Sequence, residues 1–108
     1  MARPADLSAE NARAMIARAK LSYPVLVVGP PPAPEAEKTA RHVELAARYA
    51  EVCRGLDVPF LDILGPIRSV DAWWEEVAVG DGIHPGARGY AALADLVDAW
   101  PAWRAWLP

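Results

Sequence analysis

The fold is decided by Val25-Leu26-Val27-Val28, an unbroken aliphatic run that Gly29 and three prolines close. A run without polar alternation indicates a strand buried on both faces, as in a parallel sheet covered by helices. A second strand is predicted over residues 58–64, Val58-Pro59-Phe60-Leu61-Asp62-Ile63-Leu64, which Gly65-Pro66 ends. A helical pattern separates the two strands, so we expect them to be parallel and joined by a right-handed crossover.

Four helices are predicted from apolar residues that recur at helical spacing. Ser8 is the expected N-cap of the first helix and Ser69 that of the third, whereas Gly55 is the expected C-cap of the second. In chain order the four helices cover about residues 9–20, 35–54, 70–77 and 87–100.

The architecture is therefore α/β, but it has too few strands. Two parallel strands cannot cover four helices, and sheets usually hold about four to six strands. Residues 25–28 would leave an unpaired aliphatic edge, which favours association with another chain. We therefore expect an incomplete sheet and self-association through its exposed edge.

Composition excludes several classes of function. A length of 108 residues indicates one domain or a piece of one, and a net charge of -3 argues against nucleic acid as a partner. The apolar stretches are too short to span a bilayer, and the N-terminus does not resemble a signal peptide, so the chain as written is expected to be cytoplasmic. Cys53 is the single cysteine, and with two histidines it does not make a zinc site.

The stretch most suited to chemistry is Gly80-Asp81-Gly82-Ile83-His84-Pro85-Gly86. A serine-hydrolase triad needs an imidazole that accepts the serine proton and a carboxylate that holds this imidazole in one tautomer. Asp81 lies three residues before His84 in a loop rich in glycine, so its carboxylate can fold back onto Nδ1, with Ile83 as the expected buried anchor. The same pattern is also typical of a plain turn, in which Asp81 caps a helix or forms an Asx-turn.

From residue 23 to residue 97 the order of elements resembles the C-terminal half of the SGNH hydrolases, also called the GDSL lipase/esterase family. The matching blocks are Val25-Leu26-Val27-Val28-Gly29-Pro30-Pro31-Pro32, Val58-Pro59-Phe60-Leu61-Asp62, and Asp81-Gly82-Ile83-His84-Pro85 with Gly89-Tyr90 after it. The resemblance implies a flavodoxin-like, three-layer α/β fold with parallel strands. It also implies that Asp81 and His84 are two members of a Ser-His-Asp triad.

Two blocks of that family are absent from this sequence. The family carries its nucleophile in a Gly-Asp-Ser block and an oxyanion donor in a Gly-x-Asn-Asp block, and neither occurs here. The three serines, Ser8, Ser22 and Ser69, stand in other contexts. We therefore expect residues 1–108 to be the C-terminal part of one SGNH hydrolase-like domain, with the N-terminal half missing and the chain alone inactive. A secreted location is then also open, because a signal peptide could lie in the missing half.

The function that the resemblance implies is hydrolysis of a small ester by a serine-type acylhydrolase, with no metal or cofactor. The alternative is a non-catalytic interaction module that reuses half of the fold.

Four other features are expected to be structural. Asp62 closes the second strand and can accept a hydrogen bond from the loop above it. His42 is expected to be solvated on its helix, and Cys53 to lie in the core. Trp73 and Trp74 could wall an acyl pocket or pack in the core.

Overall fold

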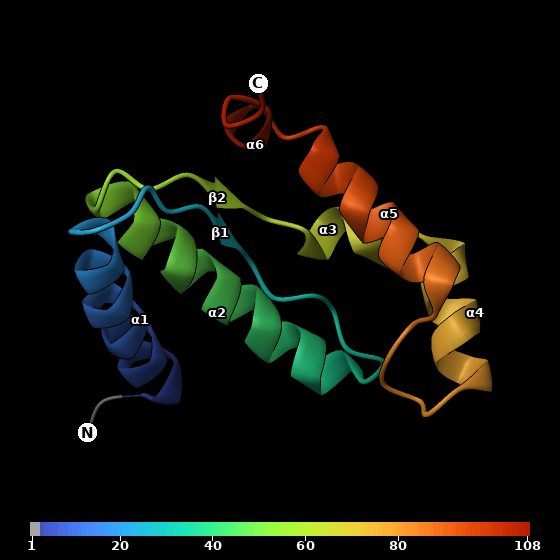
Figure 1. The fold of residues 1–108 in the computed structure, drawn as a ribbon. Coiled ribbons are helices and arrows are strands. Elements are labelled where there is room, and N and C mark those ends of the chain that lie inside the picture. Colours follow the sequence, from blue (N-terminus) through green and yellow to red (C-terminus); the bar gives the residue numbers. More distant parts are fainter. Residues whose placement is uncertain (1–2) are drawn as a thin grey trace.

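The computed structural model describes residues 3–108, which form six helices and two short strands (Figure 1). In chain order the elements are α1 (Pro4–Lys20), β1 (Val27–Val28), α2 (Ala36–Gly55), β2 (Phe60–Leu61), α3 (Leu64–Arg68), α4 (Asp71–Val79), α5 (Ala87–Asp98) and α6 (Pro101–Arg104). No helix in this part of the chain is long and apolar enough to cross a membrane.

The two strands are parallel, as the sequence predicts. Val27 pairs with Phe60 and Val28 with Leu61, and α2 forms the crossover between the strands. The Gly29 N–H extends the ladder by donating to the Leu61 carbonyl at 2.8 Å. The fold is thus a small parallel α/β arrangement of the kind expected for part of an SGNH hydrolase.

Both strands are shorter than predicted, with two residues each instead of four and seven. Prolines limit them, because Pro30 follows the last ladder donor and Pro59 precedes β2 without an N–H of its own. The prediction that residues 25–28 are buried on both faces is wrong, because residues 25–27 are only half-buried and Val28 is 43% exposed. Only one strand lies beside β1 in the described chain.

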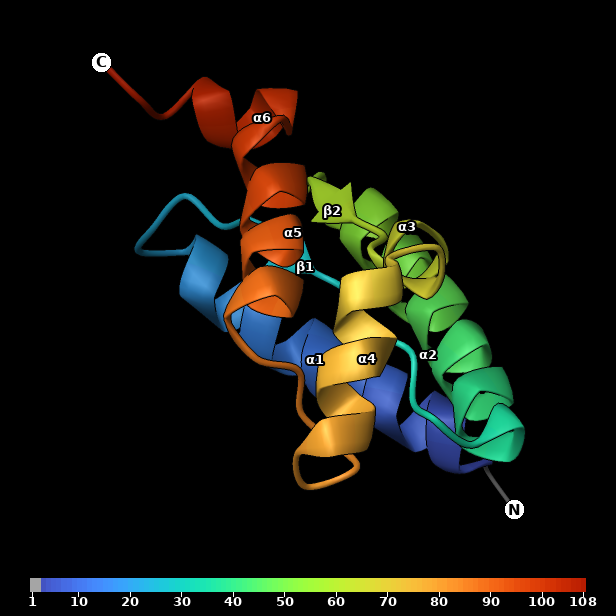
Figure 2. The ribbon, with the colours of Figure 1, turned by 90° about the vertical axis from the view of Figure 1, so that its right-hand side faces the viewer.

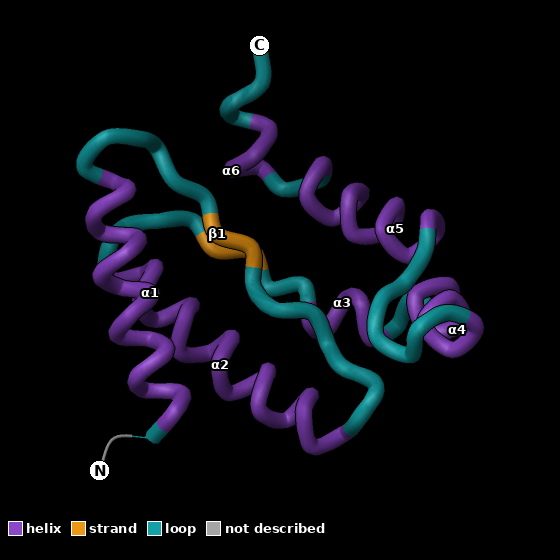
Figure 3. The backbone as a smooth tube through the Cα atoms, turned by 60° about the horizontal axis from the view of Figure 1, so that its bottom comes forward, coloured by secondary structure: helices purple, strands orange, loops and turns teal. Residues whose placement is uncertain are grey.

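Two hydrophobic clusters hold the molecule together. The first joins α1 to α2 and the strands, and its buried members are Ile16, Val52, Cys53 and Val58. The second joins the end of β2 to α3 and α4, with leucines of α5 against it, and its buried members are Ile63, Ile67, Trp73 and Val77. Figure 3 shows the strands lying between the α1–α2 pair and the chain segment that contains α5 and α6. The buried Cys53 confirms the prediction that this residue belongs to the core.

The molecule is flat and open. Its extents are 47 × 42 × 19 Å, and its radius of gyration is 15.0 Å. A compact domain of this length would have a radius of gyration of about 13 Å. The turned view in Figure 2 shows α4 and α5 side by side at the front with α1 behind them, and Figure 1 shows α1 on the opposite side of the molecule. The two clusters therefore form two small cores bridged by the strands.

Two helix starts differ from prediction. α1 begins at Pro4 rather than near residue 9, so Ser8 lies inside the helix and Arg3 is its N-cap. Proline is well suited to this first position because its fixed φ is helical and its missing N–H would be unpaired anyway. Ser69 is likewise not the N-cap of α4, because Val70 takes that position and Ser69 ends α3.

Helix α3 was not predicted at all. Leu64 was assigned to the second strand and Gly65-Pro66 to its end, yet all three begin this short helix. Pro66 fits because the first turn of a helix has no intrahelical acceptor for its N–H groups. The Asp62 carboxylate accepts the Leu64 N–H at 3.1 Å and so supports this turn, in agreement with the structural role predicted for Asp62.

Candidate functional site

The site is built on the loop between α4 and α5, residues 80–86. Gly82 has φ +79°, a conformation that side chains with a Cβ rarely adopt, and it donates its N–H to the Val77 carbonyl at 3.0 Å. This reversal turns the chain back over the end of α4. Asp81 and His84 therefore stand on either side of a tight turn.

The Asp81 carboxylate contacts both the backbone and the imidazole. Its Oδ1 accepts the N–H groups of Ile83 at 2.8 Å and His84 at 2.7 Å, which makes an Asx-turn. Its Oδ2 lies 2.7 Å from His84 Nδ1. The turn and the triad-like contact therefore coexist, one on each carboxylate oxygen.

These contacts keep Asp81 ionised and decide which nitrogen of a neutral His84 ring carries the proton. The His84 hydrogen bond, together with the two backbone N–H groups, holds the pKa of the Asp81 carboxyl far below its usual range. An ionised carboxylate only accepts hydrogen bonds, so His84 donates from Nδ1 and its neutral ring keeps a free lone pair on Nε2. Both side chains reach solvent, with 54% of Asp81 and 66% of His84 exposed. The imidazole is therefore oriented to accept a proton at Nε2.

His84 lines a cleft of about 370 Å³ beyond the carboxyl ends of both strands. Val28 and Gly29 come from the end of β1, and Ile63 follows β2. In open α/β sheets this end is where ligands bind. The remaining walls are largely proline, aromatic and aliphatic side chains, among them Trp73, so the cleft suits an apolar ligand. Trp73 is also 4% exposed and belongs to the second core cluster, which confirms the predicted packing in the core.

His42 is a second histidine at this cleft, which sequence reasoning missed. The prediction that it is solvated on its helix is wrong, because it is half-buried and its Nδ1 donates to the Pro31 carbonyl at 2.8 Å. The contact depends on the proline segment after β1 folding back along α2. Such a tertiary contact leaves no periodic signal in the sequence.

Ile83 is not the buried anchor of the loop. Its exposed fraction is 66%, and it faces the cleft instead. The buried residues are Pro85 and Gly89. A Cβ added at Gly89 would lie 2.5 Å from Pro85 Cβ, so these two residues pack in direct contact and hold the loop against α5.

Glu76 of α4 is another residue that sequence reasoning missed. Its carboxylate accepts the backbone N–H groups of Gly86 at 3.1 Å, Arg88 at 3.2 Å and Gly89 at 2.6 Å. The Gly89 hydrogen bond contributes most to a lowered pKa of Glu76. A signal did exist, because Gly86 at the N-cap of α5 has no side chain with which to cap the helix.

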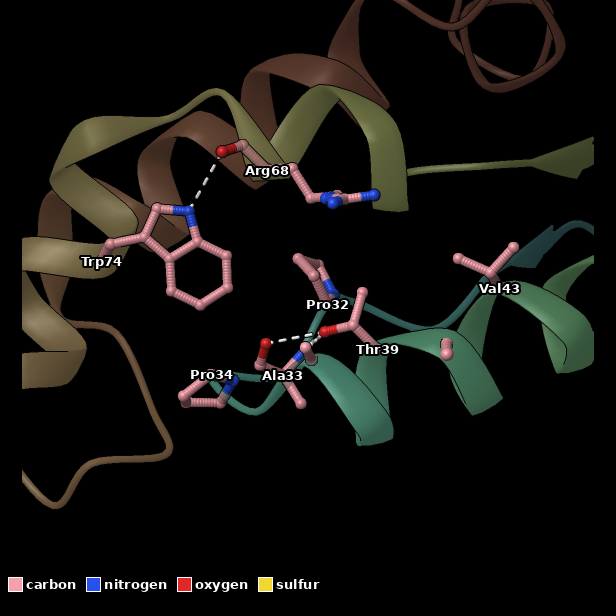
Figure 4. A pocket seen from close by; sticks show the side chains of 9 residues that line it. Pro32, Ala33, Pro34, Thr39, Val43, Arg68 and Trp74 are labelled. Atoms are coloured by element: carbon pink, nitrogen blue, oxygen red, sulfur yellow. Dashed lines mark hydrogen bonds between the residues drawn. The ribbon is translucent and has the colours of Figure 1, made fainter.

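A second cavity of about 430 Å³ adjoins the cleft across the segment 32–34. Figure 4 shows it between the start of α2 and the Trp74 ring, with the Arg68 side chain extending across one side. The Thr39 hydroxyl donates to the Ala33 carbonyl at 2.7 Å, and Trp74 Nε1 donates to the Arg68 carbonyl at 3.1 Å. Trp74 thus lines this cavity rather than the cleft of His84.

No serine lines the cleft in the part of the chain that the structure describes. Ser8 lies in α1 beside a different pocket, Ser22 follows α1, and Ser69 ends α3. Residues 3–108 also contain no group of three or more His, Cys, Asp or Glu side chains that could hold a metal ion. The structure therefore brings an aspartate and a histidine together beside a cleft that none of the three serines lines.

Comparison with known protein families gives one match. Residues 1–92 match the GDSL-like Lipase/Acylhydrolase family. The matched stretch includes both strands, the crossover helix and the whole loop that carries Asp81 and His84, and it ends within α5. A search of curated proteins found no match.

Proposed function

Because the chain belongs to the GDSL-like lipase/acylhydrolase family, we propose that it supplies the Asp and His of a Ser-His-Asp triad in an ester hydrolase. The observation that carries the proposal is the 2.7 Å contact between Asp81 Oδ2 and His84 Nδ1. His84 also lines the cleft beyond the carboxyl ends of both strands. In this proposal residues 1–108 are the C-terminal part of a single hydrolase domain.

The proposed chemistry assigns one role to each residue. His84 Nε2 accepts the proton of a serine hydroxyl as the serine oxygen attacks the ester carbonyl, and Asp81 stabilises the imidazolium that forms. The imidazolium then returns the proton to the departing alcohol, which leaves an acyl-serine. Water, deprotonated by the same imidazole, hydrolyses this acyl-serine and releases the acid. The short Asp81–His84 contact supports these roles because it places the proton of the neutral ring on Nδ1, which leaves Nε2 as the acceptor, and because it puts a carboxylate beside the imidazolium that forms.

The serine nucleophile and the oxyanion donors are proposed to come from a segment outside these 108 residues. Ser8, Ser22 and Ser69 all lie away from the cleft, and the apolar walls of the cleft suit a small ester. On this proposal the flat shape reflects a sheet that further strands complete.

The experiment compares the chain alone with a protein that joins it to a segment carrying the Gly-Asp-Ser and Gly-x-Asn-Asp blocks. The chain alone should hydrolyse short p-nitrophenyl esters at close to the background rate. In the joined protein Asp81→Asn should lower kcat by about 10⁴-fold, because the imidazole loses its correct tautomer. Asp95→Asn, a change of the same kind on an exposed part of α5, is the matched control.

Two results would contradict the proposal. One is robust turnover by the chain alone, with a serine-directed phosphonate attached to one of its own serines. The other is a joined protein in which Asp81→Asn and Asp95→Asn have equal kcat values.

A non-catalytic interaction module is the second candidate, and the open sheet edge favours it. β1 pairs with β2 alone in the described chain, and Val28 at this edge is 43% exposed. Such an edge can accept a strand from another chain. The coding sequence upstream of Met1 separates the candidates, because the hydrolase requires the two missing blocks in frame and the interaction module does not.

A further inference from the structure

The Glu76 side chain contacts the loop of His84 from a neighbouring helix. Its carboxylate accepts three backbone N–H groups at the start of α5, at 2.6 to 3.2 Å. Only 18% of this side chain is exposed, against 63% for Glu75 next to it. Among the described residues Glu75 accepts a side-chain hydrogen bond from Arg88 at 2.9 Å and none from the backbone, and the Arg88 Nε atom also lies 3.8 Å from Glu76. Of the two adjacent glutamates, Glu76 therefore binds the backbone at the start of α5, whereas Glu75 binds a side chain.

The groups that Glu76 binds are those that a helix leaves unpaired. Gly86 is the N-cap of α5, and the N–H groups of its first turn lack intrahelical acceptors. Gly86 has no side chain to accept them, so the carboxylate of α4 takes the place of a local cap. A negative charge at a helix N-terminus is also favourable because it faces the positive end of the helix dipole.

This contact also fixes the position of His84. Only Pro85, which is buried and has a rigid φ, separates His84 from Gly86. At the other end of the loop, Gly82 donates its N–H to the Val77 carbonyl, next to Glu76 in α4. Both ends of the loop are therefore attached to the last turns of the same helix.

Close packing leaves the loop little room to shift. A Cβ added at Gly86 would lie 3.1 Å from Glu76 Oε2, and one at Gly89 would lie 3.1 Å from Glu76 Oε1. The second would also lie 3.2 Å from Trp73 Cα. The carboxylate thus fills the space between α4 and the start of α5.

We propose that Glu76 is a positioning residue that holds His84 in register with Asp81 by anchoring Gly86 and Gly89 to α4. The geometric part of the proposal concerns the isolated chain. Its consequence for catalysis rests on the proposed function.

The test measures the tautomer of His84 in the 108-residue chain at a pH where the ring is neutral. Two-bond and three-bond ¹H–¹⁵N NMR correlations from the carbon-bound ring protons report how far each ring nitrogen is protonated. Wild type should show His84 with its proton on Nδ1, because Asp81 Oδ2 accepts it.

Glu76→Gln keeps the size of the side chain but removes its charge and places an NH₂ group against backbone donors. It should lower the ratio of the Nδ1–H to the Nε2–H tautomer about two- to fivefold, as expected when an exposed pair loses its alignment. Glu76→Ala should lower it at least as far.

Two controls separate positioning from general destabilisation. Glu75→Gln changes the neighbouring carboxylate without touching the α5 backbone and should leave the His84 ratio unchanged. His42 is an internal reference, because its Nδ1 contact with Pro31 lies on other elements and should not change in any variant. If Glu76→Ala does not fold, the His84 tautomer ratio of Glu76→Gln alone tests the proposal.

The proposal is overturned if the Gly86 and Gly89 amide signals shift in Glu76→Gln while the His84 ratio stays at the wild-type value. Glu76 would then cap α5 without positioning the imidazole. This readout does not require catalysis, so an inactive joined protein would reject the proposed function and leave the result for Glu76 standing.

Discussion

Gly89→Ala tests how closely α4 and α5 approach each other beneath the site. The new Cβ would lie 2.5 Å from Pro85 Cβ and 3.2 Å from Trp73 Cα. Pro85 is rigid and Trp73 Cα belongs to the backbone of α4, so neither atom can move aside as a flexible side chain would. The helices must separate slightly, and Pro85 must move with them.

The expected magnitude follows from two opposing effects. Overpacking of a tight site costs about 1–3 kcal/mol. Alanine inside a helix is favoured over glycine by about 1 kcal/mol, which offsets part of that cost. We therefore expect Gly89→Ala to lower the free energy of unfolding by up to about 2 kcal/mol. For a chain of about 100 residues this corresponds to a fall in Tm of up to about 9 °C.

The assay is thermal and urea unfolding followed by tryptophan fluorescence and circular dichroism. Gly65→Ala in α3 is the matched control, because an added Cβ there meets nothing within 4 Å. It should leave the stability unchanged or raise it by up to about 1 kcal/mol. If Gly89→Ala proves as stable as Gly65→Ala, the argument from close helix contact is refuted.

Two further predictions concern acid stability and association. The pKa of Glu76 is lowered by folding, so its contribution to stability is complete above about pH 4.3 and disappears as the pH falls through the lowered value. The Tm of wild type should therefore fall more steeply below that pH than the Tm of Glu76→Gln, and equal slopes would contradict the assignment. The open edge of β1 should make the chain self-associate, whereas sedimentation of a stable monomer at about tens of micromolar would speak against it.

If this loop is catalytic, the geometry of Asp81 and His84 is maintained by the rigidity of the loop and not by burial of the two side chains. Asp81 and His84 are both more than half exposed, yet two backbone N–H groups and the carboxylate hold the turn. Glycine at position 82 allows the reversal, and Glu76 anchors the far end. Such preorganisation is what a general base requires before substrate arrives.

Sequence alone determined the elements whose cause is local. An unbroken aliphatic run predicts the place and the parallel pairing of β1, although not its burial, and helical spacing of apolar residues predicts α2 and α5 within two residues at their ends. The offset between Asp81 and His84 in a glycine-rich turn was enough to predict their contact. In each case the residues that interact lie close together along the chain or repeat with a fixed period.

Only the tertiary structure decided the features that depend on distant partners. Strand length depends on neighbouring strands and prolines, so β1 and β2 are shorter than their aliphatic runs. The contact between His42 and Pro31 exists because a proline segment folds back along α2. Glu76 caps a helix ten residues further along the chain, and no pattern of spacing encodes such a distance. The Glu76 contacts form because backbone donors at the start of a helix must be paired with whatever acceptor the packing of the helices brings near, and the His42 contact likewise pairs a carbonyl with a donor from a distant element.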